Sequence, residues 1–218
     1  YTQRDLSYEF LGLRFENPFI LAAAPSTDNL DMVRRAFHMG WAGAILKTTS
    51  IEGTRVDLAY PMMSTFNHDG KRLFGMGNID LISEYHIDKV EHNVKKLKKE
   101  FPEKIVAASI MAGRKEDWQR LVERLEKAGV DFIECSFSCP QGNIGEDPGK
   151  MLAQSISATE LTARWVKEAA RRVPVSIKIT PHVTDIVEVA NAVKRSGADA
   201  ITASNSIQAL MGIDIKTF

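Results

Sequence analysis

The chain has 218 residues, with 28 Lys+Arg against 28 Asp+Glu, so its formal net charge is zero. That balance gives no reason to expect a nucleic acid or a membrane surface as partner. No apolar run approaches the roughly 20 residues of a membrane-spanning helix. The two cysteines, Cys135 and Cys139, would be too far apart in a strand to form a disulfide. We therefore expect one globular domain in a reducing cytoplasm.

The first elements are predicted to be strands. Residues 6–15 alternate apolar and polar side chains around Gly12, which predicts a β-hairpin. Residues 19–24 form a continuous apolar run that Pro25 ends. Such a run is typical of a strand buried on both faces, as in a parallel sheet.

One unit then recurs along the chain: a helix end, a glycine, and a strand that finishes in small polar residues. It occurs around Gly40, Gly129 and Gly197. Alternating strands and helices indicate an α/β fold with a parallel sheet. The predicted strands lie at residues 19–24, 44–47, 105–110, 132–137, 176–179 and 200–203. The predicted helices lie at residues 31–39, 86–99, 117–128, 158–172 and 185–196.

The connection at residues 51–82 is too long for an ordinary link between elements. It is rich in turn residues, including Gly70, Gly75 and Gly77. Connections of this length are commonly functional, so we expect a site loop here. No interdomain linker is visible, and residues 1–218 are expected to form one domain.

Polar residues gather where the predicted strands end. They are Lys47, Thr48, Ser136, Ser138, Cys139, Lys178, Asn205 and Ser206. In a barrel of alternating strands and helices these ends meet at one mouth, where the active site lies. A single lysine there is usually a surface charge or an ion-pair partner. Two lysines in equivalent places, inside otherwise apolar strands, favour a site.

The two cysteines are expected to differ. Cys135 lies inside a strand and is interpreted as an inert core residue. Cys139 lies beyond the strand end, before a glycine-rich loop at residues 141–149. A thiol there can act as a general acid or base, because its free pKa of about 8.5 responds to neighbours such as a lysine. The histidines are scattered, so no metal site is predicted. The sequence contains no GxGxxG pattern, which is the fingerprint of a dinucleotide-binding fold.

Seven motifs, in order, resemble one known family. They are 16-ENPF-19, 43-GAILKT-48, 78-NIDLISE-84, 108-ASIM-111, 138-SCP-140, 178-KITP-181 and 202-TASNS-206. Together they resemble the flavin barrel of dihydropyrimidine dehydrogenases and of class 1 dihydroorotate dehydrogenases, from about Leu6 to Ile213. The resemblance implies a TIM (β/α)8 barrel that binds FMN at its mouth. It also implies an oxidoreductase of the EC 1.3 type that reduces or oxidises the carbon–carbon double bond of a pyrimidine-like ring.

The resemblance assigns roles to individual residues. It implies cofactor contacts from Ala22, Ala23, Lys47, Thr48 and Lys178. It implies substrate contacts from Asn78, Ser136, Ser138, Asn205 and Ser206. Cys139 matches the acid/base cysteine of the family, which exchanges a proton with one ring carbon while hydride passes between flavin and the next carbon. Lys178 is expected near the pyrimidine edge of the flavin, where a cation stabilises the anionic reduced form.

Departures from the family pattern leave the substrate open. Ser136 stands where the family usually has asparagine, and a site built around an amide rejects substrates that leave its hydrogen bonds unpaired. Arg114 and the loop after Cys139 also differ. The family barrel has eight strands and holds the FMN phosphate after the last two, whereas six are predicted here. We therefore expect a C-terminally incomplete barrel, or one that a partner completes.

Partners and alternatives follow from the same residues. No cysteine-rich cluster motif is present, so an iron–sulfur or NAD(P)H electron source is expected in a partner subunit or another domain. Open sheet edges favour pairing and hence a homo-oligomer. The 138-SCPQ-141 string and the Asn78 motif favour dihydropyrimidine chemistry. Class 1 dihydroorotate dehydrogenase is the alternative, and a flavin-free partial barrel serving as a binding or assembly module is an alternative of another class.

Overall fold

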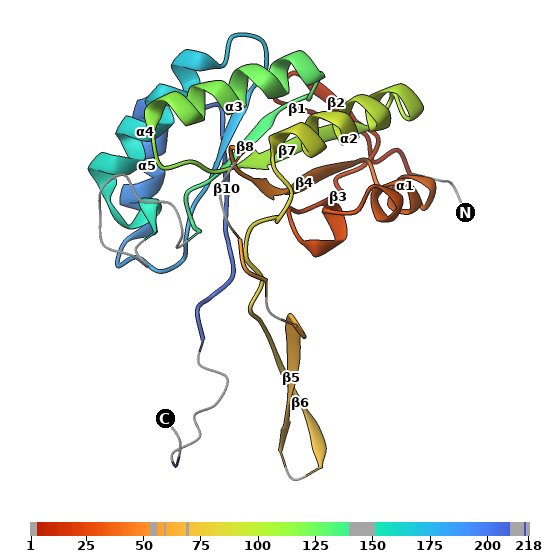
Figure 1. Ribbon diagram of the computed structural model, residues 1–218, viewed down its shortest axis with the longest axis vertical. Coiled ribbons are helices and arrows are strands. Elements are labelled where there is room, and N and C mark those ends of the chain that lie inside the picture. Colours follow the sequence, from red (N-terminus) through yellow and green to blue (C-terminus); the bar gives the residue numbers. More distant parts are fainter. Residues whose placement is uncertain are drawn as a thin grey trace.

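A parallel sheet of six strands forms the centre of the molecule. The computed structural model describes residues 4–52, 56–58, 60–68, 70–139, 151–209 and 216. The sheet consists of β3 (Ile20–Leu21), β4 (Gly43–Thr49), β7 (Ile105–Ile110), β8 (Ile133–Ser136), β9 (Val175–Lys178) and β10 (Ala200–Thr202). Their spatial order follows the chain, β3-β4-β7-β8-β9-β10, and every neighbouring pair is parallel. The sheet curls into a half-barrel, which confirms the predicted α/β fold and its six strands (Figure 1).

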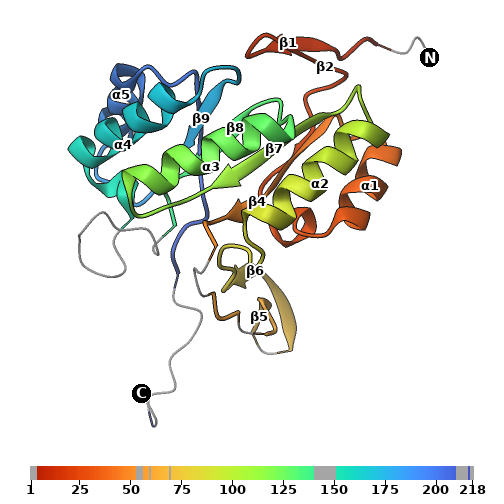
Figure 2. The same ribbon diagram turned by 45° about the horizontal axis from the view of Figure 1, so that its top comes forward.

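Five α-helices alternate with these strands and cover the outer face of the sheet. They are α1 (Leu30–His38), α2 (Ile87–Glu100), α3 (Lys115–Ala128), α4 (Ile156–Ala169) and α5 (Ile186–Ser196). Each lies within a few residues of its predicted position. Two short 3-10 helices, η1 (Pro25–Thr27) and η2 (Leu152–Gln154), precede α1 and α4. Figure 2 shows the helices side by side along the sheet.

Local sequence signals explain where these helices begin and end. The side chains of Asn29 and Asp185 accept hydrogen bonds from the first backbone amides of α1 and α5. The repeated glycines Gly40, Gly129 and Gly197 all have positive φ, at 95°, 91° and 85°. Glycine reaches this conformation without steric cost, so it ends the helix and turns the chain toward the next strand.

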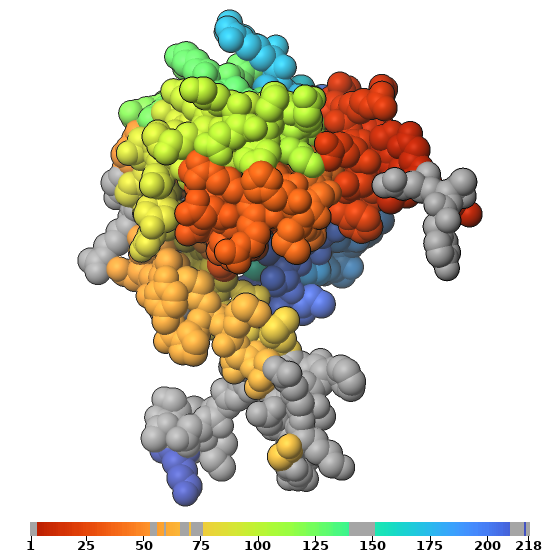
Figure 3. Space-filling model, turned by 90° about the vertical axis from the view of Figure 1, so that its right-hand side faces the viewer, coloured from red at the N-terminus to blue at the C-terminus, as the bar shows by residue number. Residues whose placement is uncertain are grey.

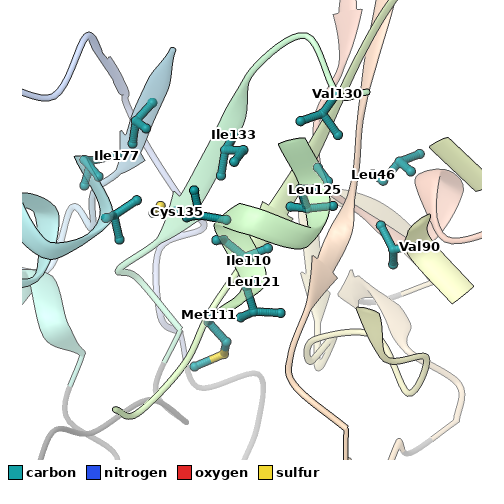
Figure 4. Close-up of a cluster of buried hydrophobic side chains, with 14 of the residues drawn as sticks. Leu46, Val90, Ile110, Met111, Leu121, Leu125, Val130, Ile133, Cys135 and Ile177 are labelled. Atoms are coloured by element: carbon teal, nitrogen blue, oxygen red, sulfur yellow. The ribbon is translucent and has the colours of Figure 1, made fainter. Parts of the chain in front are cut away.

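The main hydrophobic core lies between the sheet and the helices. Leu46, Ile110, Ile133, Cys135 and Ile177 point from the strands toward apolar residues of the helices (Figure 4). In Figure 4 these helix residues include Val90, Leu121 and Leu125. Because side chains alternate along a strand, the next residues along each strand face the inside of the half-barrel.

A second, smaller cluster closes the amino end of the half-barrel. Phe15, Ile45, Ile105 and Phe132 are buried there. The predicted N-terminal hairpin is confirmed as β1 (Tyr8–Phe10) and β2 (Leu13–Phe15), and the Tyr8 and Phe15 rings stack at 4.9 Å. In Figure 2 this hairpin lies at the opposite end of the molecule from the β5–β6 hairpin.

The connection at residues 51–82 contains a hairpin that was not predicted. Strands β5 (Met63–His68) and β6 (Lys71–Asn78) pair antiparallel and extend away from the sheet (Figures 1 and 3). Met63 and Met76 are exposed on it. The turn residues were recognised, but the flanking residues lack the alternation of polar and apolar side chains that marks a half-buried strand.

Among the described residues, no helix is long and apolar enough to cross a membrane.

Candidate active site

The inner face of the sheet is polar toward its carboxyl end. Ser109 on β7, Glu134 on β8 and Ser176 on β9 are neighbours in register. One step further along, Ser136 pairs with Lys178, and Lys178 pairs with Thr202 on β10. Paired residues of parallel strands point to the same face, so these side chains share one surface.

Lys47 reaches this surface from β4, and its side chain is 3% exposed. Its ammonium donates a hydrogen bond of 2.5 Å to Oδ1 of Asp80. Sequence reasoning predicted Lys47 as a site residue but missed Asp80. The signal was available, since Asp80 lies inside the 78-NIDLISE-84 motif, two residues after Asn78.

Ser83 anchors the segment that carries Asp80. Its backbone amide donates to the carbonyl oxygen of Thr48 at 2.8 Å, and its hydroxyl donates to Oδ1 of Asp28 at 2.7 Å. Burial raises the pKa of the Asp28 carboxyl, an effect that the Ser83 hydrogen bond opposes. The Thr48 hydroxyl lies 2.9 Å from that of Ser109. The segment after β6 is therefore tied to the carboxyl end of β4.

Cys139 lies three residues beyond β8, with its sulfur 3.0 Å from the Ser136 hydroxyl. Burial raises the pKa of the thiol. The Ser136 hydrogen bond and the nearby charge of Lys178 act in the opposite direction. The lysine influence expected from the sequence is present, but burial outweighs it. The thiol is therefore protonated at neutral pH and can donate a proton.

Cys135 behaves as the sequence predicted. Both cysteines are free, and Cys135 is fully buried among the apolar residues between sheet and helices. Burial raises the pKa of its thiol well above the usual range. Its predicted place in the core is confirmed, and its inertness stays a prediction that this burial supports.

Lys178 ends β9 and approaches a buried carboxylate. Its ammonium lies 4.0 Å from Oε1 of Glu134, whose side chain is 1% exposed. The Thr202 hydroxyl donates to the other oxygen, Oε2, at 2.9 Å. Glu134 was missed as a site residue, although a glutamate inside an otherwise apolar strand was a visible signal.

Asn205 joins two strand ends. Its Nδ2 donates to the Ser138 hydroxyl at 2.9 Å, and its backbone amide donates to the carbonyl oxygen of Ile179 at 3.2 Å. Ser138 is buried, whereas Ser206 is exposed and donates its backbone amide to Oδ1 of Asn205. The loops after β8, β9 and β10 therefore meet at this amide.

Three predicted site residues are less buried than the two lysines. Ala22 is exposed, and Ala23 is half-buried against the smaller cluster that includes Ile45. Asn78 is exposed at the end of β6, and its Oδ1 accepts from the backbone amide of Asp80 at 3.2 Å. The predicted loop at residues 141–149 lies outside the described residues. Within the described ranges, no cluster of three or more histidine, cysteine, aspartate or glutamate side chains could hold a metal.

Comparison with known proteins identifies the family. The sequence model described as dihydroorotate dehydrogenase matches residues 5–218. The chain belongs to the dihydroorotate dehydrogenase family. The resemblance read from the seven motifs is thereby confirmed at the family level.

Named relatives within the family fall into two groups. The chain is 36% identical to "Dihydropyrimidine dehydrogenase (NADP(+)), chloroplastic" of Arabidopsis thaliana, over 99% of this chain and 52% of that protein. It is 34% identical to "NAD-dependent dihydropyrimidine dehydrogenase subunit PreA" of Escherichia coli K12, over 98% and 51%. It is 31% identical to "Dihydroorotate dehydrogenase B (NAD(+)), catalytic subunit" of Pyrococcus horikoshii, over 98% and 65%. The chain thus spans about half the length of the two dihydropyrimidine dehydrogenase relatives.

A solved structure outside the dihydroorotate dehydrogenase family supports the fold. The carboxyl transferase domain from Rhizobium etli pyruvate carboxylase matches with a TM-score of 0.50 and 14% sequence identity. The match covers 85% of this chain and 26% of that one. At that identity the likeness concerns the fold and not the chemistry.

Proposed function

We propose that this protein is an FMN-dependent oxidoreductase that reduces or oxidises the carbon–carbon double bond of a pyrimidine-like ring, as dihydropyrimidine dehydrogenases do. The observation that carries the proposal is that Lys47, Cys139, Lys178 and Asn205 all lie toward the carboxyl ends of strands of one sheet, β4, β8, β9 and β10. This edge is where α/β barrels carry their active sites.

The residues at the mouth fit a flavin. Two buried ammonium groups, of Lys47 and Lys178, face one polar surface. Asp80 and Glu134 make it possible to bury these two charges, and the ammonium groups can donate further hydrogen bonds to the acceptor atoms of a flavin ring. We propose that Lys47, Thr48 and Lys178 hold the cofactor, with Ala22 and Ala23 offering little steric bulk beside it. FMN, when bound, supplies the hydride exchange.

Cys139 would carry the proton. In the reducing direction the S–H bond of Cys139 breaks and its proton passes to a ring carbon of the substrate, leaving a thiolate. In the oxidising direction the thiolate takes that proton back. The raised pKa of the thiol favours the protonated donor. The Ser136 hydroxyl at 3.0 Å and the Lys178 charge stabilise the thiolate left behind.

Asn205, Ser138, Asn78, Ser136 and Ser206 would bind the planar substrate. The Asn205 amide is held by Ser138, so one of its donors has a fixed direction. Fixed polar groups of this kind select a ring that completes their hydrogen bonds. Ser136 is already directed at the Cys139 sulfur, so it serves the thiol as well as the substrate.

An electron-transfer partner is part of the proposal. One relative is named as a subunit of an NAD-dependent dihydropyrimidine dehydrogenase, and another as the catalytic subunit of an NAD(+)-linked enzyme. We propose that this protein exchanges electrons with an iron–sulfur or NAD(P)H-binding subunit or domain, assembles as a homo-oligomer and acts in the cytoplasm. Co-purification of the full-length protein with its neighbouring gene products tests the partner.

Oxidation of dihydroorotate is the second candidate. The family description and the Pyrococcus horikoshii relative at 31% identity favour it. The two dihydropyrimidine relatives are more similar, at 36% and 34%. Steady-state assays of the full-length protein with uracil, thymine and dihydroorotate distinguish the two candidates. We expect a higher kcat/KM for uracil and thymine than for dihydroorotate.

Cofactor analysis tests the proposal more broadly. The full-length protein should release FMN on denaturation, and Lys178→Met should weaken FMN binding at least about tenfold through loss of a buried charge contact. A full-length protein that takes up no FMN would overturn the proposed function. It would favour the flavin-free module instead.

A further inference from the structure

Glu134 is the most deeply buried acidic group of the inner face. Glu134 is 0% exposed and lies on β8, whose four residues are all buried. One carboxylate oxygen, Oε2, accepts a hydrogen bond from Thr202. The other, Oε1, makes no hydrogen bond within the described part of the chain. A buried carboxylate oxygen without a partner is unfavourable unless a charge compensates it.

The compensating charge is the ammonium of Lys178, at 4.0 Å from Oε1. Burial raises the pKa of the Glu134 carboxyl, and Lys178 is the strongest influence in the opposite direction. Thr202 and Ser109 act in the same direction as Lys178. Among the described residues, the Glu134 charge also acts on the Cys135 and Cys139 thiols, and Lys47, which acts on Cys139, forms an ion pair with Asp80.

The register explains why these two side chains meet. Ser136, not Glu134, is the register partner of Lys178, so Glu134 lies one inward-facing position deeper in the half-barrel. The flexible lysine stem can place its charge anywhere within several ångströms. A carboxylate buried beneath it on β8 restricts that choice.

We propose that Glu134 is a positioning residue of the site: its carboxylate is the counter-ion that holds the Lys178 ammonium at the carboxyl end of β9. Glu134 itself touches neither substrate nor cofactor in this proposal. Its charge also acts on Cys139, where it favours the protonated thiol. Glu134 thus serves the proposed proton donor and the proposed cofactor contact together. The inference rests on the proposed function, whereas the contact between Glu134 and Lys178 does not depend on it.

The test measures the reactivity of the Lys178 amine, since acetic anhydride acetylates the neutral amine and not the ammonium. Full-length wild type, Glu134→Gln and Thr202→Val are labelled at pH 8 with a trace of acetic anhydride. Acetylation of Lys178 is read by peptide mass spectrometry against Lys96, which is exposed on α2. Removing a negative partner at this distance should raise the Lys178 rate about tenfold.

Thr202→Val is the matched control. It removes the hydrogen bond to Glu134 and leaves the carboxylate charge, so the Lys178 rate should stay within about twofold of wild type. A merely structural role for Glu134 predicts the same small change in both variants. Equal rates in wild type and Glu134→Gln would overturn the proposal.

Infrared difference spectroscopy decides the matter if Glu134→Gln does not fold or Lys178 is too shielded to label. In wild type at pH 7 the proposal expects a carboxylate band for Glu134, and Lys178→Met should convert it to a protonated carboxyl band. A Glu134 band that is already protonated in wild type, or unchanged in Lys178→Met, would contradict the proposal. Neither measurement requires FMN or substrate, so a failure here leaves the proposed function standing, and the reverse also holds.

Discussion

Cys139 is the residue on which the proposed proton transfer depends. Cys139→Ser should lower turnover at least about 100-fold, because a serine hydroxyl is a far weaker acid than a thiol. FMN binding should be retained. Cys135→Ala is the matched control, since that thiol faces the helices. Steady-state kinetics and flavin content measure both variants, and a Cys139→Ser enzyme with near wild-type turnover would contradict the proton role.

Ser136 acts on the pKa of that thiol against the larger effect of burial. Its hydrogen bond favours the thiolate, so Ser136→Ala should raise the pKa of Cys139 further above its usual range. The pH dependence of Cys139 alkylation by iodoacetamide measures this shift. The alkaline limb of the reductive pH–rate profile should move to higher pH with it, since the protonated thiol is the donor. A shift to lower pH would contradict the assigned hydrogen bond.

At the residue scale, the sequence predicted where polar side chains lie along the strands, while their roles stay predictions. Lys47 and Lys178 lie in the carboxyl-terminal parts of β4 and β9, Cys139 and Asn205 follow β8 and β10, and parallel strands bring these ends together. Glu134 and Asp80 were visible in the sequence as acidic residues in a buried strand and in a motif, but their partners were not. Their contacts with Lys178 and Lys47 join different elements and depend on the fold.

At the scale of elements, Gly43 allows β4 and β7 to approach closely. A Cβ at this position would lie 2.7 Å from the Ile105 carbonyl oxygen and 2.9 Å from the Ile105 Cβ. Gly43→Ala should therefore reduce the free energy of unfolding by about 1–3 kcal/mol. Gly43 lies at the amino end of β4, away from Lys47, so the folded fraction should keep its turnover. Urea unfolding measures the loss, and an unchanged midpoint would refute the close contact.

The segment after β6 depends on Ser83. Ser83→Ala removes the hydrogen bonds to the Asp28 carboxyl and to the Tyr85 amide. The expected loss is about 1–3 kcal/mol of unfolding free energy, with a higher KM because Asp80 loses its anchor. Ser157→Ala, at an exposed position on α4, is the control and should change little. An unaltered KM in Ser83→Ala would show that this segment does not contribute to substrate binding.

The elements themselves were largely predictable. Helices and buried strands were located because periodicity, end glycines and apolar runs are local signals. The β5–β6 hairpin was not, because its sequence shows no alternation of polar and apolar side chains, and the hairpin extends away from the sheet (Figure 1). Its role as a site loop remains a prediction, supported by Asn78 and Asp80 at its base.

At the scale of the whole molecule, the two faces of the half-barrel differ in the side chains that they carry. The outer face of the sheet is apolar and packs on the helices, whereas the inner face carries Lys47, Glu134, Ser136 and Lys178. The overall alternation of strands and helices was visible in the sequence, and so was the gathering of polar residues toward the carboxyl ends of the strands. The electrostatic balance inside the sheet was not, because it depends on which inward-facing side chains become buried.

The most direct test of the central claim is the anaerobic half-reaction of the full-length protein, followed by its visible flavin absorbance. Dihydrouracil or dihydrothymine should bleach the flavin of the wild-type protein within the time of turnover. In Cys139→Ser the bleaching should be at least about 100-fold slower, because the base that takes the ring proton is lost. A protein without flavin, or one bleached by dihydroorotate faster than by either dihydropyrimidine, would contradict the proposed function.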